Sequence, residues 1–230
     1  MNKYLKYILP AVAILFLMSA TAGTASAQIL REILNRMDSN NKQLVSLKSN
    51  IKMNKANAQL GENDISEGSL SYLPGKTENQ IYLRIDWSKP VVEHLAIKNG
   101  RYKLLIPRKK QIIEGKVDKV KSGPKAGGAL AFMTMSRAQL SANYDVKYAG
   151  DETVSGGVRT FHLVLTPKVG ASYKSADLWV DSDGMPVQAK IVEKNNDSTT
   201  ILLTNIQRNA TVKASDFDIV KPKDVSVIQG

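Results

Sequence analysis

A period-two alternation of apolar and polar residues, repeated in short runs between Gly68 and Ile206, most constrains this chain. Such runs predict β-strands with one apolar face, and Pro, Gly, Asn or Asp residues separate most of them. A further strand is predicted over Gln111–Val120. Asn99-Gly100 and Asp183-Gly184 are hairpin signals, because these residue types tolerate a positive φ. We therefore predict a mainly β protein with an antiparallel sheet or barrel.

Two segments break this alternation. Residues 29–47 have apolar residues near helical spacing and predict one amphipathic helix. Residues 123–143 begin with three glycines and continue with Ala129–Met135, which are helix formers and apolar all round. We expect one or two short helices there. The predicted class is thus α+β, dominated by the sheet.

The first 27 residues have the three parts of a secretory signal peptide. Lys3 and Lys6 precede an apolar run over residues 8–18, and small residues follow up to Ala25-Ser26-Ala27. A membrane anchor is the weaker alternative, because the run is shorter than the ~20 residues that span a bilayer and contains Pro10. We expect cleavage after Ala27, export to the periplasm, and a single domain over residues 28–230.

The charge of the chain is concentrated in one segment. The formal net charge is +11, and it falls to +9 once the two signal-peptide lysines are removed. Residues 98–125 hold ten basic and two acidic residues, a local charge of +8. This segment is either a solvated hairpin that protects a sheet edge or a surface, including Arg108, Lys109 and Lys110, that docks anionic lipid headgroups or an acidic partner. Because the chain is expected to be exported, we do not expect nucleic acid as a partner.

The titratable residues indicate no catalytic or metal site. The chain has no cysteine, which excludes disulfides, thiolate metal sites and an acylated N-terminal cysteine. His94 and His162 each lie inside a predicted strand, where we expect structural roles. Asp181-Ser182-Asp183-Gly184 resembles the start of a calcium loop, but its twelfth position is Val192, so a type I′ turn is the simpler interpretation. We expect no enzyme activity and no cofactor.

The apolar face of the sheet has two interpretations. The sheet can close on itself as an ordinary core, or it can curve around a cavity that accepts an apolar ligand. Met133 and Met135 fit both, since Met fills irregular gaps and adapts to variable ligands. Composition alone leaves both interpretations open.

The order of several motifs resembles the LolA-type family, the periplasmic carriers of outer-membrane lipoproteins. The motifs are Gly68-Ser69-Leu70-Ser71-Tyr72-Leu73-Pro74, Ile85–Pro90, Asn99–Pro107, Leu163–Lys168, Asp181–Pro186, Thr200–Asn205 and Phe217. The resemblance covers most of residues 28–230 and depends on order and spacing, because no single motif is specific. Leu73 departs from the family pattern, in which many members carry an Arg associated with holding the lid shut.

The resemblance implies an unclosed antiparallel barrel with an N-terminal helix and a helical lid, for which the 123–143 segment is our candidate. It also implies a monomer that takes acyl chains of lipoproteins from an inner-membrane releasing transporter to an outer-membrane acceptor. The residues expected to line the cavity are Leu70, Tyr72, Ile81, Leu83, Ile85, Trp87, Leu95, Ile97, Tyr102, Leu104, Leu130, Phe132, Met133, Phe161, Leu163 and Leu165.

Two other functions are compatible with the sequence. Envelope regulators with a related domain use the half-barrel to bind a protein, although they usually carry a second domain. A carrier of a lipid other than lipoproteins is equally compatible with the motifs.

Overall fold

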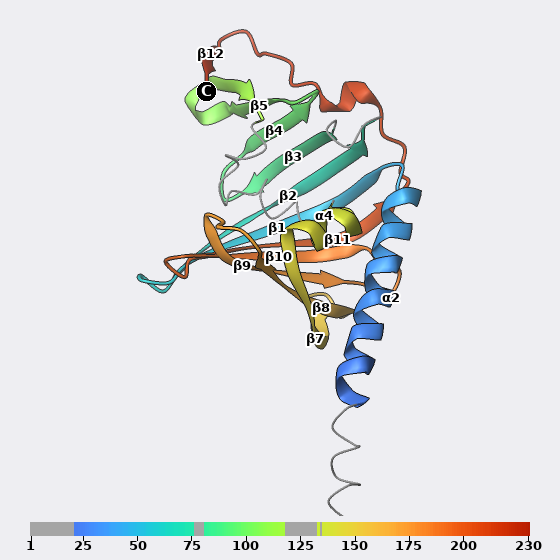
Figure 1. Ribbon diagram of the computed structural model, residues 1–230. Helices are drawn as coiled ribbons and strands as arrows, with labels where there is room; N and C mark the ends of the chain where they lie inside the picture. Colours follow the sequence, from blue (N-terminus) through green and yellow to red (C-terminus); the bar gives the residue numbers. More distant parts are fainter. Residues whose placement is uncertain (1–20, 76–80, 118–132, 134) are drawn as a thin grey trace, which may run out of the picture.

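The computed structural model describes residues 21–75, 81–117, 133 and 135–230. Those residues form one curved sheet with helices on its concave side (Figure 1). No helix among them is both long enough and apolar enough to cross a bilayer. Of the predicted signal peptide and lid segment, residues 1–20, 123–132 and 134 lie outside the described residues.

The sheet has twelve strands in the order β12-β6-β5-β4-β3-β2-β1-β11-β10-β9-β8-β7. All neighbours are antiparallel except β12 and β6, which are parallel. Within the described residues, the end strands β12 and β7 are not paired with each other, so the barrel is unclosed as predicted. The strands are β1 (Leu47–Asn57), β2 (Glu62–Pro74), β3 (Ile81–Lys89), β4 (Glu93–Lys98), β5 (Arg101–Ile106), β6 (Gln111–Lys116), β7 (Tyr144–Val154), β8 (Val158–Pro167), β9 (Tyr173–Val180), β10 (Pro186–Glu193), β11 (Ser198–Arg208) and β12 (Ser226–Gln229).

Two α-helices of the described chain cover part of the concave face. Helix α2 (Thr21–Gln43) buries Ile33, Leu34 and Met37 in the main core, and its opposite face is polar. Helix α4 (Arg137–Asn143) begins with a capping box between Ser136 and Gln139 and buries Leu140. The expected cleavage site after Ala27 falls within α2, before the residues that α2 buries in this core.

The convex face of β3–β6 is covered by the C-terminal segment, which includes the short 3₁₀ helix η2 (Ala214–Phe217). Ile219 and Val225 pack on Ala96, Leu105 and Ile112 in a second apolar cluster. Phe217 is fully buried, and its ring centroid lies 5.7 Å from that of Tyr82.

Two polar side chains of the sheet hold the same segment. Arg84 donates to the carbonyls of Asp216 and Asp218, at 3.0 and 3.1 Å, and Lys98 pairs with the Asp218 carboxylate at 2.7 Å. This packing brings Ser226–Gln229 alongside β6, so the tail beyond residue 220 is partly ordered as a strand.

Three local predictions need correction. The helix predicted at 29–47 extends over Thr21–Gln43 instead, and Leu47 begins β1. Leu44 and Leu47 fit helical spacing, but Leu47 also fits the alternation of a strand. The strand predicted over residues 111–120 ends at Lys116, since Val117 is not in a strand, and residues 118–120 lie outside the described residues. The turn at Asp183-Gly184 is not type I′, because only Gly184 has a positive φ.

The glycines of two predicted motifs have clear steric roles. Asn99 and Gly100 have φ of 52° and 72°, as the predicted hairpin turn requires. Gly68 lies where the β2–β3 register shifts, and a Cβ there would be 2.3 Å from the Asp86 carbonyl oxygen. The Gly-x-Leu motif therefore marks a close approach between backbones.

Candidate functional site

The candidate site is the concave apolar face. Directly paired residues of neighbouring strands lie on the same face of a sheet, so the register shows which side chains share it. One row crosses the sheet through Leu70, Ile85, Leu95, Leu104, Ile113 and Ile228, and we call it the edge row. A parallel row consists of Leu47, Tyr72, Leu83, Ile97 and Tyr102.

The other half of the face continues the same pattern. Leu163 pairs with Leu178, Leu178 with Ala189, and Ala189 with Ile201. Ile201 in turn pairs with Met53 of β1, which joins the two halves. Phe161 and Leu165 lie on this face because they alternate with Leu163 along β8.

The predicted lining residues share this one face in every described strand. The buried members, all in the main core, are Leu70, Tyr72, Leu83, Ile85, Trp87, Ile97, Met133, Leu163 and Leu165. The half-buried members that pack against this core are Ile81, Leu95, Tyr102 and Phe161. Leu104 is half-buried outside the core, and Leu130 and Phe132 lie outside the described residues.

Coverage of this face falls toward the β12 edge. Along the edge row, the exposed fraction is 0% at Ile85 and 42% at Ile228, and Leu95, Leu104 and Ile113 between them are half-buried. Across β8–β11, by contrast, the inward side chains Leu163, Leu178, Ala189 and Ile201 are all fully buried. The concave face therefore passes from a closed core to a partly uncovered apolar wall.

Sequence reasoning missed two members of this wall. Ile113 falls within a predicted strand, but its neighbour Ile112 is also apolar and faces the convex cluster, so alternation did not assign a side. Ile228 lies in a short tail, and its parallel pairing with Ile113 joins residues more than a hundred positions apart. Val225 and Val227 flank the polar Ser226, but the apolar Ile228 follows Val227 directly, so the alternation is too short to assign a strand face there.

Tyr102 closes one end of the wall. A Cβ on Gly115 would lie 2.9 Å from Tyr102 Cε1, and one on Gly230 would lie 2.2 Å from the Tyr102 hydroxyl oxygen. The Tyr102 ring thus lies over Gly115 of β6 and reaches Gly230, where the absence of side chains leaves room for it.

Helix α4 and Met133 lie over the middle of the face. Met133 and Leu140 are buried in the main core, and Leu140 is fully enclosed. Polar contacts hold α4 from two sides: Arg137 donates to Asn35 of α2, and Lys168 Nζ donates to the Ser141 carbonyl at 2.7 Å. One buried leucine is therefore the main apolar attachment of α4.

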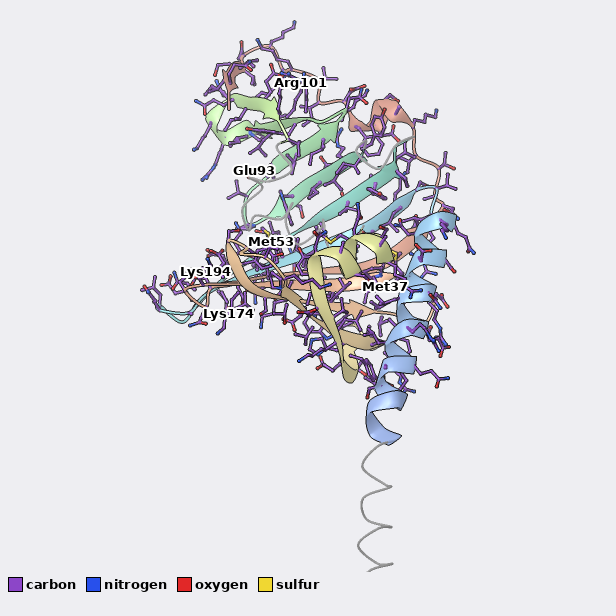
Figure 2. All side chains as sticks on the ribbon, in the orientation of Figure 1. Met37, Met53, Glu93, Arg101, Lys174 and Lys194 are labelled. Atoms are coloured by element: carbon purple, nitrogen blue, oxygen red, sulfur yellow. The ribbon has the colours of Figure 1, made fainter. Side chains whose placement is uncertain are left out.

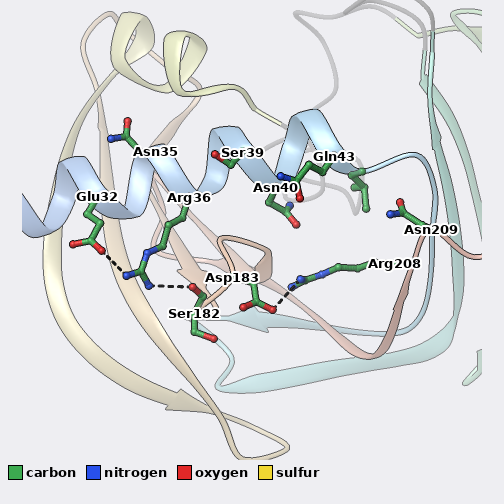
Figure 3. Close-up of a pocket in the computed structure, with 11 residues that line it drawn as sticks. Glu32, Asn35, Arg36, Ser39, Asn40, Gln43, Ser182, Asp183, Arg208 and Asn209 are labelled. Carbon is green, nitrogen blue, oxygen red and sulfur yellow. Dashed lines mark hydrogen bonds and ion pairs between the residues drawn. The ribbon is translucent and has the colours of Figure 1, made fainter.

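A polar cavity of about 610 Å³ lies between α2 and the β9–β10 turn (Figure 3). The residues that line it are Glu32, Asn35, Arg36, Ser39, Asn40, Gln43, Leu44, Ser182, Asp183, Arg208 and Asn209. Arg36 pairs with Glu32 at 2.5 Å, and Arg208 pairs with Asp181 and Asp183 at 2.7 and 3.0 Å. Both cations are therefore neutralised by side chains of the cavity region.

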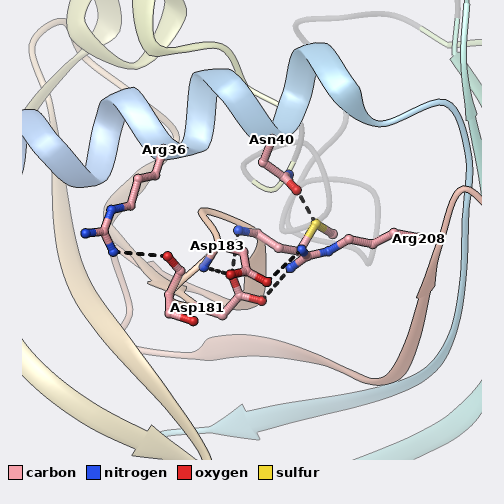
Figure 4. A network of polar contacts seen from close by, with 7 residues as sticks. Arg36, Asn40, Asp181, Asp183 and Arg208 are labelled. Carbon is pink, nitrogen blue, oxygen red and sulfur yellow. Dashed lines mark hydrogen bonds and ion pairs between the residues drawn. The ribbon is translucent and has the colours of Figure 1, made fainter.

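The contacts around this cavity attach α2 to the sheet (Figure 4). Arg36 donates to the Ser182 carbonyl at 3.1 Å, and Asn40 contacts Met185 Sδ at 3.4 Å. Gly184 has a φ of +86°, and a Cβ there would lie 2.3 Å from the Arg36 carbonyl carbon and oxygen. The Asp181–Gly184 turn therefore packs tightly against α2, and we call this contact the clamp on α2.

The two histidines lie in hydrogen-bond networks with carboxylates on the convex face. His94 Nδ1 is 2.6 Å from Asp86, and His162 lies 2.9 Å from both Glu152 and Asp177. His162 also stacks on Trp179, with ring centroids 4.5 Å apart. Among the described residues, no group of three or more His, Cys, Asp or Glu is arranged to hold a metal ion.

Two carboxyl groups of these networks have lowered pKa values. Burial alone would raise the pKa of Asp86, but the hydrogen bonds and charges of Arg84 and His94 together outweigh it and lower the pKa. The indole hydrogen bond from Trp179 lowers the pKa of Glu152, with help from His162. Both shifts favour the ionised form that these pairs need.

The cationic turn, Arg108–Lys110, joins β5 to β6 beside the β12 edge. All three side chains are exposed and form no ion pair with any described residue. The Lys110 carbonyl accepts from the Ser226 amide at 3.0 Å, which brings the turn to the start of β12. Arg101 and Lys116, which are directly opposite each other, add two further exposed cations to these strands.

Comparisons with known proteins bear on the family. Residues 115–220 match the family model described as outer membrane lipoprotein carrier protein LolA. The match and the unclosed barrel support a divergent member of the LolA-type family. The match includes the predicted motifs from Leu163 to Phe217, whereas those from Gly68 to Pro107 precede it. Curated protein sequences give no match to the chain.

Several solved structures are similar in fold. An uncharacterized conserved protein from Thermus thermophilus aligns with a TM-score of 0.55 and 13% identity, over 87% of this chain and 99% of that one. A chain of the Pseudomonas aeruginosa MucA/MucB complex aligns with a TM-score of 0.49 and 14% identity, over 82% of this chain and 60% of that one. A putative outer membrane lipoprotein-sorting protein domain from Vibrio parahaemolyticus aligns with a TM-score of 0.45 and 15% identity, over 81% of this chain and 95% of that one.

Leu73 lies on the convex side, because it alternates with the buried Tyr72 and pairs with Tyr82. A side chain at this position of β2 therefore points away from α4 and Met133. The arginine latch associated with this motif in the family has no counterpart at Leu73.

Proposed function

We propose that this protein is a periplasmic carrier that binds acyl chains of lipoproteins, or of another lipid, on its concave face and moves them from the inner to the outer membrane. It carries out no catalysis in this role and needs no cofactor. The match to the lipoprotein carrier family supports a carrier-type function. The predicted export supports the periplasmic location.

The observation that carries this proposal is the partly uncovered wall along the edge row. Leu95, Leu104 and Ile113 are aliphatic and half-buried, and they continue directly from the fully buried Ile85. Each methylene of an acyl chain gains about 0.8 kcal/mol when it leaves water. A wall that is apolar but incompletely covered offers this gain without unfolding the core.

A carrier must also release its ligand, and α4 with Met133 is our candidate for the movable cover. Burial of Leu140 and of Met133 contributes about 1.5–3 kcal/mol each, which is small enough for transient opening. The remaining contacts of α4, such as Lys168 to Ser141, involve exposed side chains and contribute less. Opening of this cover would widen the wall toward Leu163 and Leu165.

The test begins with the processed protein purified from the cell envelope without detergent. Bound lipid is extracted and identified by mass spectrometry, and a lipoprotein labelled on an acyl chain is then added to the delipidated protein. We expect co-purified acyl chains and saturable binding of the label. Absence of both would contradict the carrier function.

A matched pair of variants tests whether the acyl chain binds along the edge row. Leu104→Asp introduces a charge into the edge row and should abolish binding of the label. Ile65→Asp makes the same kind of change at an exposed position of β2 and should leave binding intact. Equal binding by both variants would place the ligand elsewhere.

A further inference from the structure

The β12 edge combines exposed aliphatic side chains with a neighbouring group of cations. Val227 and Ile228 of β12 are both 42% exposed, and Val220, which precedes the strand, is 84% exposed. The cationic turn adjoins the first residue of β12 through the Lys110 carbonyl. Exposed aliphatic side chains thus lie beside three cations that have no acidic partner among the described residues.

The strand that carries this surface is firmly held from behind. Val225 is buried in the convex cluster with Leu105 and Ile112, and Gly230 N donates to the Glu114 carbonyl at 3.0 Å. The segment before it is fixed by Arg84 and Lys98 through Asp218. Val227 and Ile228 are therefore exposed on a strand that is held in place.

The edge row connects this surface to the interior. Ile228 pairs with Ile113, Ile113 with Leu104, and the row ends at the buried Ile85 and Leu70. An apolar chain that entered at Ile228 would contact aliphatic side chains along the whole path.

We propose that the β12 edge and the cationic turn form a docking surface for an anionic phospholipid bilayer, with Ile228 as the point where an acyl chain enters. Arg108, Lys109 and Lys110 attract the headgroups, and Val227 and Ile228, on the two faces of the edge strand, contact the acyl boundary. The proposal of an entry point rests on the carrier function proposed above. The docking surface itself rests only on charge, exposure and position.

Charge complementarity favours a membrane because the cations lack acidic partners in the described chain and the adjacent side chains are aliphatic. An acidic protein partner would use the same cations but would not require insertion of Ile228. A purely protective role, in which the cations keep other chains from the sheet edge, requires neither headgroups nor insertion. The three roles therefore differ in what vesicles alone can show.

The experiment measures binding of the processed protein to phosphatidylcholine vesicles with and without phosphatidylglycerol, by flotation. The variant Arg108→Gln/Lys109→Gln/Lys110→Gln should bind anionic vesicles about 100-fold more weakly, from about 1 kcal/mol per cation. Added salt should reduce wild-type binding and the difference between the variants. Thermal unfolding confirms that each variant is folded.

Charge alone is controlled by a second triple variant, Lys55→Gln/Lys147→Gln/Lys194→Gln. These lysines are exposed, form no ion pair with any described residue, and lie on other strands and loops; Figure 2 shows Lys194 well away from Arg101. We expect this variant to lose less than about 10-fold in binding. An equal loss in both triple variants would overturn the localised surface.

Insertion is tested by Ile228→Asn, with Val158→Asn as the control, since Val158 has nearly the same exposure, 41%. Ile228→Asn should weaken binding about 5- to 10-fold, whereas Val158→Asn should not change it. Equal binding of wild-type protein to neutral and anionic vesicles, or full binding by Ile228→Asn, would overturn the proposal. Vesicle binding without any co-purified lipid would refute the carrier function alone; co-purified lipid without vesicle binding would refute the docking surface alone.

Discussion

The two halves of the concave face are built from the same alternating strands but are covered to different degrees. In the closed half, β8–β11, the central inward side chains Leu163, Leu178, Ala189 and Ile201 are fully enclosed, and among the predicted lining residues of this half Phe161 is half-buried. In the open half, β2–β6 and β12, burial declines along the edge row until Ile228 is 42% exposed. The alternation of apolar and polar residues along a strand sets the face to which each side chain points. How deeply that side chain is buried depends on which helix or strand packs over it.

This difference in burial assigns the stability of the fold mainly to one half of the face and ligand binding mainly to the other. A fully enclosed side chain contributes to folding, because its removal leaves a cavity. A half-buried side chain contributes less to folding and keeps surface for a ligand. The same residue types thus have different roles on one continuous face.

The largest expected effect contrasts Leu163 with Leu104. Leu163→Ala should lower the free energy of unfolding by about 2–5 kcal/mol and weaken lipid binding per folded molecule less than Leu104→Ala does. Leu104→Ala should cost less than about 1.5 kcal/mol in stability and weaken lipid binding. Denaturant unfolding and lipid titration measure the two quantities. Equal stability losses would remove the distinction between the halves.

The clamp on α2 gives the next effect. Gly184→Ala forces a Cβ against the Arg36 backbone at a positive φ, so we expect a stability loss above the ~1 kcal/mol of backbone strain alone. Gly61→Ala is the control, because Gly61 has φ +68° and a Cβ there would meet no atom within 4 Å. Thermal unfolding should show a much larger decrease for Gly184→Ala. Similar decreases in the unfolding temperature of both variants would mean that α2 shifts to accommodate the added Cβ.

The cover over the face predicts a kinetic effect. Leu140→Ala removes the main apolar attachment of α4, so release of bound lipid should accelerate about 10- to 100-fold, for a loss of roughly 1.4–2.8 kcal/mol. Leu60→Ala makes the same substitution at an exposed hairpin position and should not change the release rate. Stopped-flow transfer of a fluorescent lipid to acceptor vesicles measures both. An unchanged rate in Leu140→Ala would show that α4 does not gate release.

The smallest effect concerns the convex face of the open half. The folded-state pKa of Asp86 lies below its unfolded value, so its ionised form stabilises the fold above about pH 4 and this contribution is lost as pH falls through the folded pKa. Asp86→Asn should flatten the decline in stability below pH 4, by less than about 1 kcal/mol. Urea unfolding at pH 3 to 6 measures it. An identical decline in wild type and variant would contradict the assigned ion pairs.

Much of this arrangement could be predicted from local sequence. Strand parity followed from alternation, and the register places Tyr72, Leu83 and Ile97 on one face as expected. The helix end at Gln43 could not be placed, because Leu44 and Leu47 satisfy both periods. The convex packing of Phe217 and Ile219 and the pairing of Ile228 with Ile113 depend on contacts between distant segments, which alternation does not encode.

The chain contains two tryptophans, and they lie on opposite faces. Trp87 is buried on the concave face of the open half, and Trp179 stacks on His162 on the convex side. Single-tryptophan variants, Trp179→Phe and Trp87→Phe, allow each to be read separately with a lipid brominated along its acyl chains. We expect bound brominated lipid to quench Trp87 and to leave Trp179 unaffected. Quenching of Trp179 alone, or of neither tryptophan despite saturated binding, would contradict acyl-chain binding on the concave face.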